Sequence, residues 1–529
     1  MLRVSQLKLP VGHSPDQLRK KIIKTLRLGE NDLKQLHIRK RSLDARKKPE
    51  LYYVYSVDVM VEREEYVLKK AKGRAQRVSE KRYRMPEHGS EQMHSRPVVV
   101  GSGPAGLFCA CLLAREGYRP VVIERGAPVR ERKEDVEHFW QTGILNPASN
   151  VQFGEGGAGT FSDGKLNTLV KDPYGRNRFV LETFVSFGAP EDILWEQKPH
   201  IGTDILINVV EAMRNHIAEL GGEFRFHSQV TDILPDESCL VINGREKMKT
   251  EAAVFAIGHS ARDTFGMLYE RGVRMEAKSF AVGVRAEHRQ EMIDRNMYGD
   301  HKGGKLPAAS YKMAEKIENG RGVYTFCMCP GGYVVNASSE ERRLAVNGMS
   351  YHGRAGENAN SAVIVTVTPD DFPSLHPLAG IQFQRELEEK AWQAGKGKVP
   401  AQRLEDFLKN RKTREFGKVR PNIMGGYTKA NVRQIFPEEL AWSIGEGICR
   451  MGRKIPGFDD ADTVLSGVES RTSSPVRILR DGEYRANFSW IYPCGEGAGY
   501  AGGITSAAMD GMKAAEAVIR RFRPEFTEN

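Results

Sequence analysis

A glycine-rich turn between an apolar run and an apolar helix constrains this chain most. Residues 98–106 read VVVGSGPAG, and the next apolar run ends in Glu124. A glycine at the first turn position permits a sharp bend, and a glycine at the second leaves room for a pyrophosphate beside the backbone amides. The pattern therefore predicts a βαβ unit that binds a dinucleotide, with phosphates at the helix N-terminus and the acid on the ribose.

The residues expected to hold one end of this cofactor lie in the same unit. We predict a helix over residues 105–116 and a second strand over 118–124. Proline suits the first helical turn, where its missing N–H costs nothing. The predicted contacts are Gly101, Ser102, Gly103, Pro104, Ala105, Gly106, Glu124 and Arg125.

A second strand–glycine–helix junction lies near the C-terminus. Residues 489–493 form an expected strand, GEGAG turns the chain at 495–499, and a helix with one apolar face spans 504–521. A protein that binds FAD needs two such junctions, because the ADP half and the flavin half of FAD lie apart. An NAD enzyme does not need the second junction. An ordinary glycine-rich turn is the alternative reading. The predicted contacts are Gly495, Glu496 on a ribityl hydroxyl, Gly502, Gly503 and Ile504.

Two further segments are expected at the same site. The loop GEGGAGTFSDGK at 154–165 is dense in glycine, so its amides suit a pyrophosphate or a flavin face, although a flexible lid would have the same composition. Residues 252–258 form an apolar strand that ends in glycine. The predicted contacts are Gly157, Gly159, Thr160, Lys165, Val230, Ala256 and Gly258.

These stretches, with AIGHSARDTF, KSFAVGVRAEH, FCMCPGGYVV, NGMSYHGRAGENANSA and GVESRTSSPVRI, carry a resemblance over residues 97–520. The chain resembles the glutathione-reductase-like superfamily of FAD flavoproteins. It is more closely similar to a bacterial and plastid family of FAD-dependent dehydrogenases. The resemblance implies non-covalent FAD in a Rossmann-like domain, and it implies no particular substrate.

The expected fold class is α/β, in three parts. A Rossmann-like FAD-binding domain over residues 96–270 and 451–529 is interrupted by an inserted mixed α+β substrate domain over 271–450. Residues 1–95 form a small basic β-α-β-β module that ends in a polar linker over 63–96.

The charge of the chain is confined to the first of these parts. Residues 1–95 hold 23 Lys and Arg against 12 Asp and Glu, which accounts for the whole net charge of +11. A solvated basic face is the ordinary reading, and docking to a nucleic acid or an acidic protein is the alternative. The seven cysteines are typical of a reducing compartment. No apolar run is long enough to span a membrane, and the N-terminal residues lack the apolar core of a signal peptide. We therefore expect a cytoplasmic protein.

The sequence identifies no catalytic residue with certainty. Arg471 is a candidate to hold an anionic small-molecule substrate or the flavin edge, and His259 is a candidate acid or base. Cys327 and Cys329 are separated by one residue, so a strand would place both thiols on one face, in a redox or a structural role. No metal site is expected.

Three functions stay open. The first is an FAD-dependent dehydrogenase that transfers a hydride between a small substrate and flavin N5. The second is a flavin monooxygenase. The third is a non-catalytic flavin-holding protein that docks to RNA or an acidic partner through residues 1–95. Because no second strand–GxGxxG–helix fingerprint is present, NAD(P)H is expected at most as a transient electron donor without its own domain.

Overall fold

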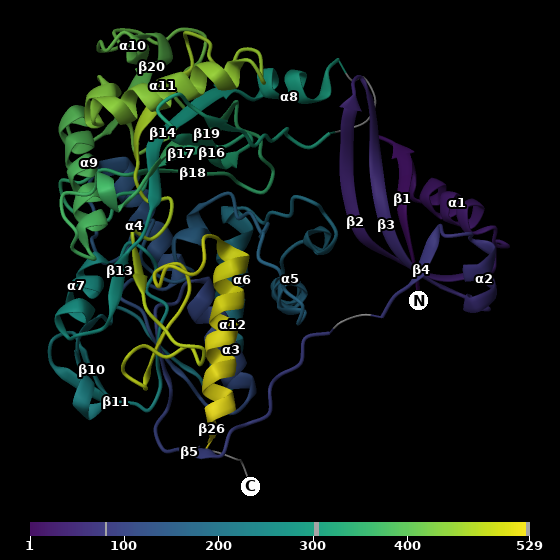
Figure 1. Cartoon of the computed structure of the whole chain (residues 1–529), viewed down its shortest axis with the longest axis horizontal. Coiled ribbons are helices and arrows are strands. Elements are labelled where there is room, and N and C mark those ends of the chain that lie inside the picture. The colour runs from purple at the N-terminus through teal and green to yellow at the C-terminus, as the bar shows by residue number, and fades with distance from the viewer. Residues whose placement is uncertain (80–81, 301–305, 525–529) are drawn as a thin grey trace.

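The computed structural model describes residues 1–79, 82–300 and 306–524. Figure 1 shows three parts: an N-terminal module standing apart, a Rossmann-like domain around α3 and α12, and an inserted domain that carries α9, α10 and α11. The α/β class and the Rossmann-like domain are therefore confirmed. No helix in the described ranges is long and apolar enough to cross a membrane.

The Rossmann-like domain is built on a five-stranded parallel sheet in the order β25-β12-β6-β7-β8. Four of its strands are short apolar runs that are buried because helices cover the sheet, whereas the edge strand β8 reads EFR and is partly buried. The five strands are β6 (Val98–Val100), β7 (Val121–Ile123), β8 (Glu223–Arg225), β12 (Ala253–Phe255) and β25 (Ile491–Pro493). Its main helices are α3 (Pro104–Arg115), α6 (Thr203–Glu219) and α12 (Ile504–Arg521).

The two glycine junctions meet because α3 and α12 pack closely. A Cβ on Gly511 in α12 would lie 2.0 Å from the carbonyl oxygen of Ala105 in α3, so only glycine fits there.

A second, three-stranded antiparallel sheet contains β9 (Val230–Leu234), β10 (Cys239–Ile242) and β11 (Glu246–Lys249).

The inserted domain holds a seven-stranded sheet in the order β15-β16-β19-β14-β23-β20-β22. Its strands are β14 (Phe280–Arg289), β15 (Ala314–Lys316), β16 (Gly322–Cys329), β19 (Asn358–Val367), β20 (Val399–Arg403), β22 (Tyr427–Lys429) and β23 (Val464–Glu469). The predicted boundary at residue 451 assigns β23 to the Rossmann-like domain. In the structure β23 pairs antiparallel with β14 and β20, so the chain leaves the insert later.

The N-terminal module contains β1 (Leu2–Pro10), α1 (Pro15–Leu26), β2 (Leu33–Lys47), β3 (Glu50–Val61), α2 (Glu64–Lys70) and β4 (Ala75–Arg77). They form an antiparallel sheet in the order β2-β3-β1-β4. The predicted β-α-β-β pattern thus lacks α2 and β4, which lie in the expected linker. Val67 is the one residue of α2 that is buried, so its sequence shows no apolar face.

This module is attached to the rest of the chain through the edge of β2. The Arg41 N–H donates to the Trp195 carbonyl at 2.7 Å, and the Gln197 N–H donates to the Arg41 carbonyl at 3.0 Å. The Arg41 guanidinium also pairs with Glu196. The edge strand therefore fixes residues 195–197, just before Lys198.

The remaining helices and strands connect these sheets. They are β5 (Glu91–Met93), α4 (Val129–Thr142), α5 (Arg176–Ser186), α7 (Arg262–Glu270), β13 (Met275–Ala277), α8 (Gln290–Tyr298), β17 (Tyr333–Asn336), β18 (Val346–Met349), α9 (Ala379–Gly395), α10 (Leu404–Leu408), β21 (Ile423–Met424), α11 (Glu438–Gly452), β24 (Val476–Ile478) and β26 (Phe522–Pro524).

Candidate functional site

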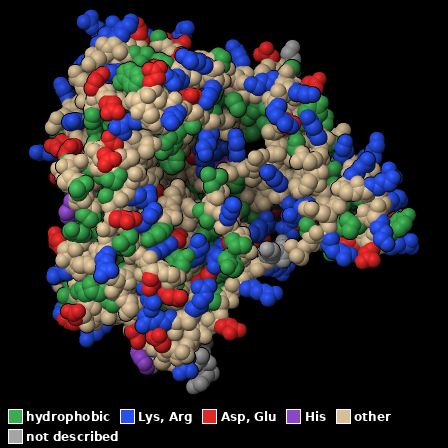
Figure 2. Space-filling model, in the orientation of Figure 1, with side chains coloured by type: hydrophobic (Ala, Val, Ile, Leu, Met, Phe, Trp, Pro, Cys, Tyr) green, Lys and Arg blue, Asp and Glu red, His purple; other side chains and the backbone are tan. Residues whose placement is uncertain are grey.

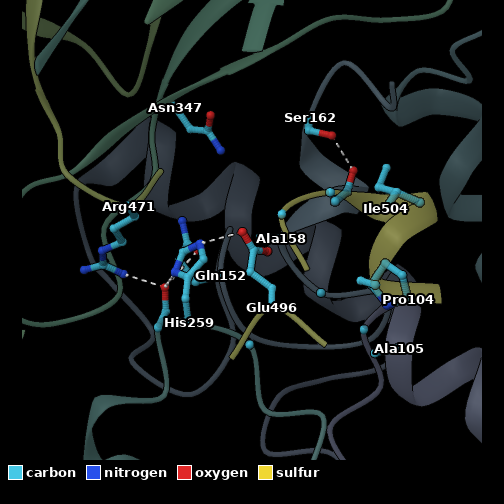
Figure 3. A pocket seen from close by; sticks show the side chains of 18 of the residues that line it. Pro104, Ala105, Gln152, Ala158, Ser162, His259, Asn347, Arg471, Glu496 and Ile504 are labelled. Atoms are coloured by element: carbon cyan, nitrogen blue, oxygen red, sulfur yellow. Dashed lines mark hydrogen bonds and ion pairs between the residues drawn. The ribbon is translucent and has the colours of Figure 1, made fainter. Parts of the chain in front are cut away.

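A cavity of about 620 Å³ lies between the Rossmann-like domain and the insert. Cofactor sites in proteins have volumes of this order. Figure 3 shows Pro104 and Ile504 on one side of it, His259 and Arg471 on the opposite side, and Glu496 between them. The cavity extends from Glu124 and Val230 to the strand residues 325–329 of the insert. It therefore runs from the predicted ribose end to the predicted substrate domain.

The first glycine turn fits a bound pyrophosphate. Gly101 has a φ of +100°, and a Cβ there would lie 2.5 Å from the Ala256 carbonyl oxygen. A Cβ on Gly103 would meet only the Gly157 Cα, at 3.7 Å, so the space beside its backbone is open to the cavity. Gly103 is also the N-cap of α3. The positive end of the helix thus faces a space that an anionic group can enter.

Glu124 connects this turn to the glycine-dense loop. Its buried carboxylate accepts the Ser102 N–H at 2.9 Å and the Ser102 hydroxyl at 2.8 Å. It also accepts the N–H groups of Gly126 at 3.0 Å and Gly154 at 3.1 Å. The protein itself therefore uses four acceptor positions of Glu124, and a ribose hydroxyl would have to share one of them. The neighbouring Arg125 is bound to Asp263 and Thr264.

Arg132 on α4 organises the glycine-dense loop, and the sequence did not reveal it. Its fully buried guanidinium donates to the carbonyls of five loop residues, at 2.6–3.3 Å: Asn150, Val151, Gly154, Glu155 and Gly157. A Cβ on Gly154 would lie 2.4 Å from Arg132 Cδ. Burial lowers the pKa of Arg132 to about 10, so it stays charged at neutral pH. Its helix reads VRERKEDVEHFWQT, which has the composition of an exposed helix, so no sequence signal marks this arginine.

Most of the predicted cofactor residues line the cavity. These are Gly101, Ser102, Gly103, Pro104, Ala105, Glu124, Arg125, Gly157, Gly159, Lys165, Val230, Ala256, Gly258, Glu496, Gly502, Gly503 and Ile504. The four candidate catalytic residues, Arg471, His259, Cys327 and Cys329, also line it. Their contacts with a cofactor or substrate stay predictions.

Three predicted cofactor residues do not line this cavity. Gly106 packs against the turn, because its Cβ would lie 1.9 Å from the Gly101 carbonyl oxygen. Gly495 donates its N–H to Asp510 and faces Ala105. Thr160 is buried below the loop, beside a small apolar hollow. The structure therefore shows a packing role for these three residues, and their contact with a cofactor stays a prediction.

Lys165, one of the predicted cofactor residues, lines the cavity. Its Nζ is 3.9 Å from an Asp163 carboxylate oxygen, and its charge acts on Lys198 and Cys327. Lys165 therefore belongs to the part of the cavity beside the insert. Its role beside a cofactor stays a prediction.

Glu496 and His259 face each other at the centre of the cavity (Figure 3). Glu496 Oε1 lies 3.9 Å from His259 Nε2. Burial raises the pKa of Glu496 to about 7, against a smaller effect from Lys278. Burial, together with Arg471 and Arg262, lowers the pKa of His259 to about 3. The imidazole is therefore neutral at pH 7, and its surroundings oppose its protonation.

The guanidinium of Arg471 is already neutralised by the protein. It donates to both carboxylate oxygens of Glu388, at 3.0 and 2.8 Å, and to Ser260 at 3.2 Å. Glu388 also accepts two hydrogen bonds from Arg262. The two arginines hold the pKa of Glu388 well below its usual range, although burial opposes them. Arg471 thus lines the cavity as part of a buried ion cluster, and its contact with a substrate or the flavin edge stays a prediction.

Cys327 and Cys329 do not share one face. The pairing of β16 with β19 shifts between Phe326 and Cys329, so an extra residue bulges out and breaks the alternation. Cys327 has a φ of +40° and an accessible side chain, whereas Cys329 is buried. Burial raises the pKa of the Cys329 thiol. The different exposure and direction of the two side chains disfavour the predicted pair of thiols on one face.

Comparisons with known proteins show which families this chain resembles. Residues 279–472 match the family described as FAD-dependent protein, C-terminal domain-like. Residues 99–130 match the NAD(P)-binding Rossmann-like domain, and residues 1–60 match the Domain of unknown function (DUF8436). A protein of Clostridium beijerinckii, described as an uncharacterized protein, is 47% identical over 532 residues, which cover 98% of this chain and 99% of that protein.

Solved structures give a more distant likeness. The flavin-dependent brominase Bmp2 is 13% identical, with 80% of this chain and 79% of that chain covered and a TM-score of 0.37. Glycine oxidase from Geobacillus kaustophilus is 12% identical, with 82% and 96% covered and a TM-score of 0.33. These values are too low to support a conclusion about the reaction. The sequence matches do support one: the chain belongs to the family of the Clostridium beijerinckii protein, and it carries a Rossmann-like nucleotide-binding segment and a segment typical of FAD-dependent proteins.

Proposed function

We propose that this protein is an FAD-dependent dehydrogenase that transfers a hydride between a small substrate and N5 of non-covalently bound FAD. The observation that carries the proposal is a continuous cavity that joins both glycine junctions to the insert. When bound, FAD supplies the hydride acceptor or donor. The finer assignment to the bacterial and plastid dehydrogenase family, and a cytoplasmic location suited to seven free cysteines, belong to the same proposal.

The residues of this chain would divide the work by their place along the cavity. The open backbone at Gly103 and the N-terminus of α3 would hold the pyrophosphate. Gly502 would let the α12 junction approach the flavin, since a Cβ there would meet nothing within 4 Å. Residues 325–329 of the insert would form the wall opposite the glycine junctions and exclude water from the substrate.

Glu496 and His259 are the groups best placed to hold a proton in this proposal. The raised pKa of Glu496 lets its carboxyl keep a proton near neutral pH, and the neutral His259 would orient a partner by hydrogen bonding without taking up a charge. Since a bound flavin would occupy space beside Glu496, this pair would sit at the ring and not at the phosphates. A ribityl hydroxyl would be the first hydrogen-bond partner expected for Glu496.

The purified protein tests the proposal. It should be yellow and release FAD on heat denaturation, and its flavin spectrum should bleach without oxygen when a hydride donor such as NADH or NADPH is added in excess. A protein that stays colourless and takes up no added FAD would refute the proposal. Substrate-dependent incorporation of labelled oxygen into a product would show a monooxygenase instead.

A further inference from the structure

The part of the cavity beside the insert carries three lysines. Lys165, Lys198 and Lys312 all line it. Lys198 Nζ donates to the Ser310 hydroxyl at 2.8 Å, which joins the Rossmann-like domain to the insert. Figure 2 shows Lys and Arg side chains gathered beside the hollow between the body and the N-terminal module. We call Lys165, Lys198 and Lys312 the lysine cluster.

The charge of the lysine cluster is not balanced by the protein. Within the described ranges, Lys198 and Lys312 form no ion pair with a carboxylate. Lys165 lies 3.9 Å from Asp163, but that carboxylate is engaged by Arg354 and Ser350. The other cations of the cavity are neutralised, as Arg471 is by Glu388. Positive charge therefore remains where the substrate would enter.

Bringing these cations together is unfavourable without an anion. Burial, the charge of Lys165 and the charge of Arg354 all lower the pKa of Lys198. The position of Lys198 is nevertheless fixed, because the edge of β2 holds residues 195–197 through Arg41. The N-terminal module thus keeps a lysine in a place that repels it, which is typical of a preorganised anion site.

We propose that the lysine cluster binds an oxyanion of the substrate, a carboxylate or a phosphate, and directs the rest of the substrate toward residues 325–329 and the flavin. This inference rests on the proposed function, since it names the substrate class of that site. It also gives the N-terminal module a role in the site, because the β2 edge of the module sets the position of Lys198.

The test is an anion titration of the whole protein. Inorganic phosphate and succinate are titrated separately at constant ionic strength with chloride, and the thermal midpoint and the flavin absorbance are recorded. At least one of the two anions should give a saturable rise in the wild-type protein. The half-saturating concentration should increase about tenfold or more in the Lys198→Gln, Lys312→Gln double variant, as expected for lost hydrogen bonds to charged groups.

The controls separate charge at this site from charge in general. Lys390→Gln on α9, an exposed lysine outside the cavity, should leave the titration unchanged. The single variant Lys198→Arg, in which Lys312 is unchanged, should keep most of the anion binding. The anion that saturates at the lower concentration identifies the source, phosphate or carboxylate. No saturable response to either anion, or wild-type saturation in the double variant, would overturn the proposal.

The failure of this inference and the failure of the proposed function can be distinguished. A missing flavin spectrum would refute FAD-dependent chemistry. The same titration of that protein, followed by its thermal midpoint, would still measure whether the lysine cluster binds an anion.

Discussion

Replacement of Arg132 by methionine should abolish tight FAD binding, although Arg132 does not line the cavity. Methionine keeps much of the buried volume but removes all donors to the five loop carbonyls. Each buried acceptor left without a partner costs about 1–3 kcal/mol, and some of these carbonyls retain other partners. Counting three losses at the lower end gives about 3 kcal/mol, and 1.4 kcal/mol corresponds to about a tenfold change in affinity. FAD affinity should therefore fall about a hundredfold.

The assay is a titration of apoprotein with FAD, followed by flavin fluorescence, together with thermal unfolding of the same samples. Arg130→Met is the matched control, because Arg130 lies on the same helix, is exposed and contacts Glu211 and Asn208. This control should keep the wild-type affinity. Gly154→Ala tests the same loop from its other side, since its Cβ would lie 2.4 Å from Arg132 Cδ at a φ of +114°.

The reasoning has a clear refutation. If Arg132→Met folds and binds FAD within a few fold of the wild-type affinity, the loop does not depend on its buried guanidinium. If Arg132→Met unfolds, Gly154→Ala decides: a folded variant with wild-type affinity would equally show that the loop and Arg132 are not coupled.

Three further predictions follow from single side chains. Gly103→Ala should weaken FAD binding at least tenfold, because the added methyl group enters the open cavity, and should change the unfolding temperature of the apoprotein little. The control is Gly266→Ala in α7, where an added methyl group also has space around it. Glu388→Gln should destabilise the protein by about 3–5 kcal/mol in urea unfolding, since it leaves Arg262 and Arg471 without their buried partner. Equal stability of Glu388→Gln and the exposed control Glu386→Gln would contradict this. The pKa of Glu496 is raised from 4.5 to about 7, so the folded apoprotein binds this proton more tightly and loses stability as the pH rises through that window. Glu496→Gln should reduce the loss of unfolding free energy between pH 5 and pH 8 by up to about 3 kcal/mol, since one pKa unit corresponds to about 1.36 kcal/mol. An unchanged pH profile of stability would show that burial does not raise the pKa of this carboxyl.

The parts of the fold that could be predicted are those specified by local patterns. The turn at Gly101 and the helix that follows show in nine consecutive residues, and α12 has one apolar face along its whole length. Each pattern reports a backbone requirement, such as a positive φ or a close helix contact, which few residue types can meet. The Rossmann-like domain was therefore visible in the sequence.

The parts that could not be predicted depend on partners far apart in the chain. Arg262 and Glu388 are separated by 126 residues, and no local pattern pairs them. Strand β23 shares the sheet of the insert because of its pairing with β14, which no local pattern specifies. The bulge at Cys327 reverses the face of a side chain by one extra residue, and the sequence of the strand looks regular.

The contact between β2 and residues 195–197 has a consequence for how the chain can be divided. Sequence composition suggests that the first 60 or so residues are a detachable unit. The structure shows that their removal would leave the Trp195 carbonyl and the Gln197 N–H without the partners they have in Arg41, and would free the segment that leads to Lys198. It would also uncover the extended backbone of residues 195–197, and an uncovered backbone edge invites pairing between molecules. A shortened protein would thus be prone to aggregation beside the cavity that Lys198 lines.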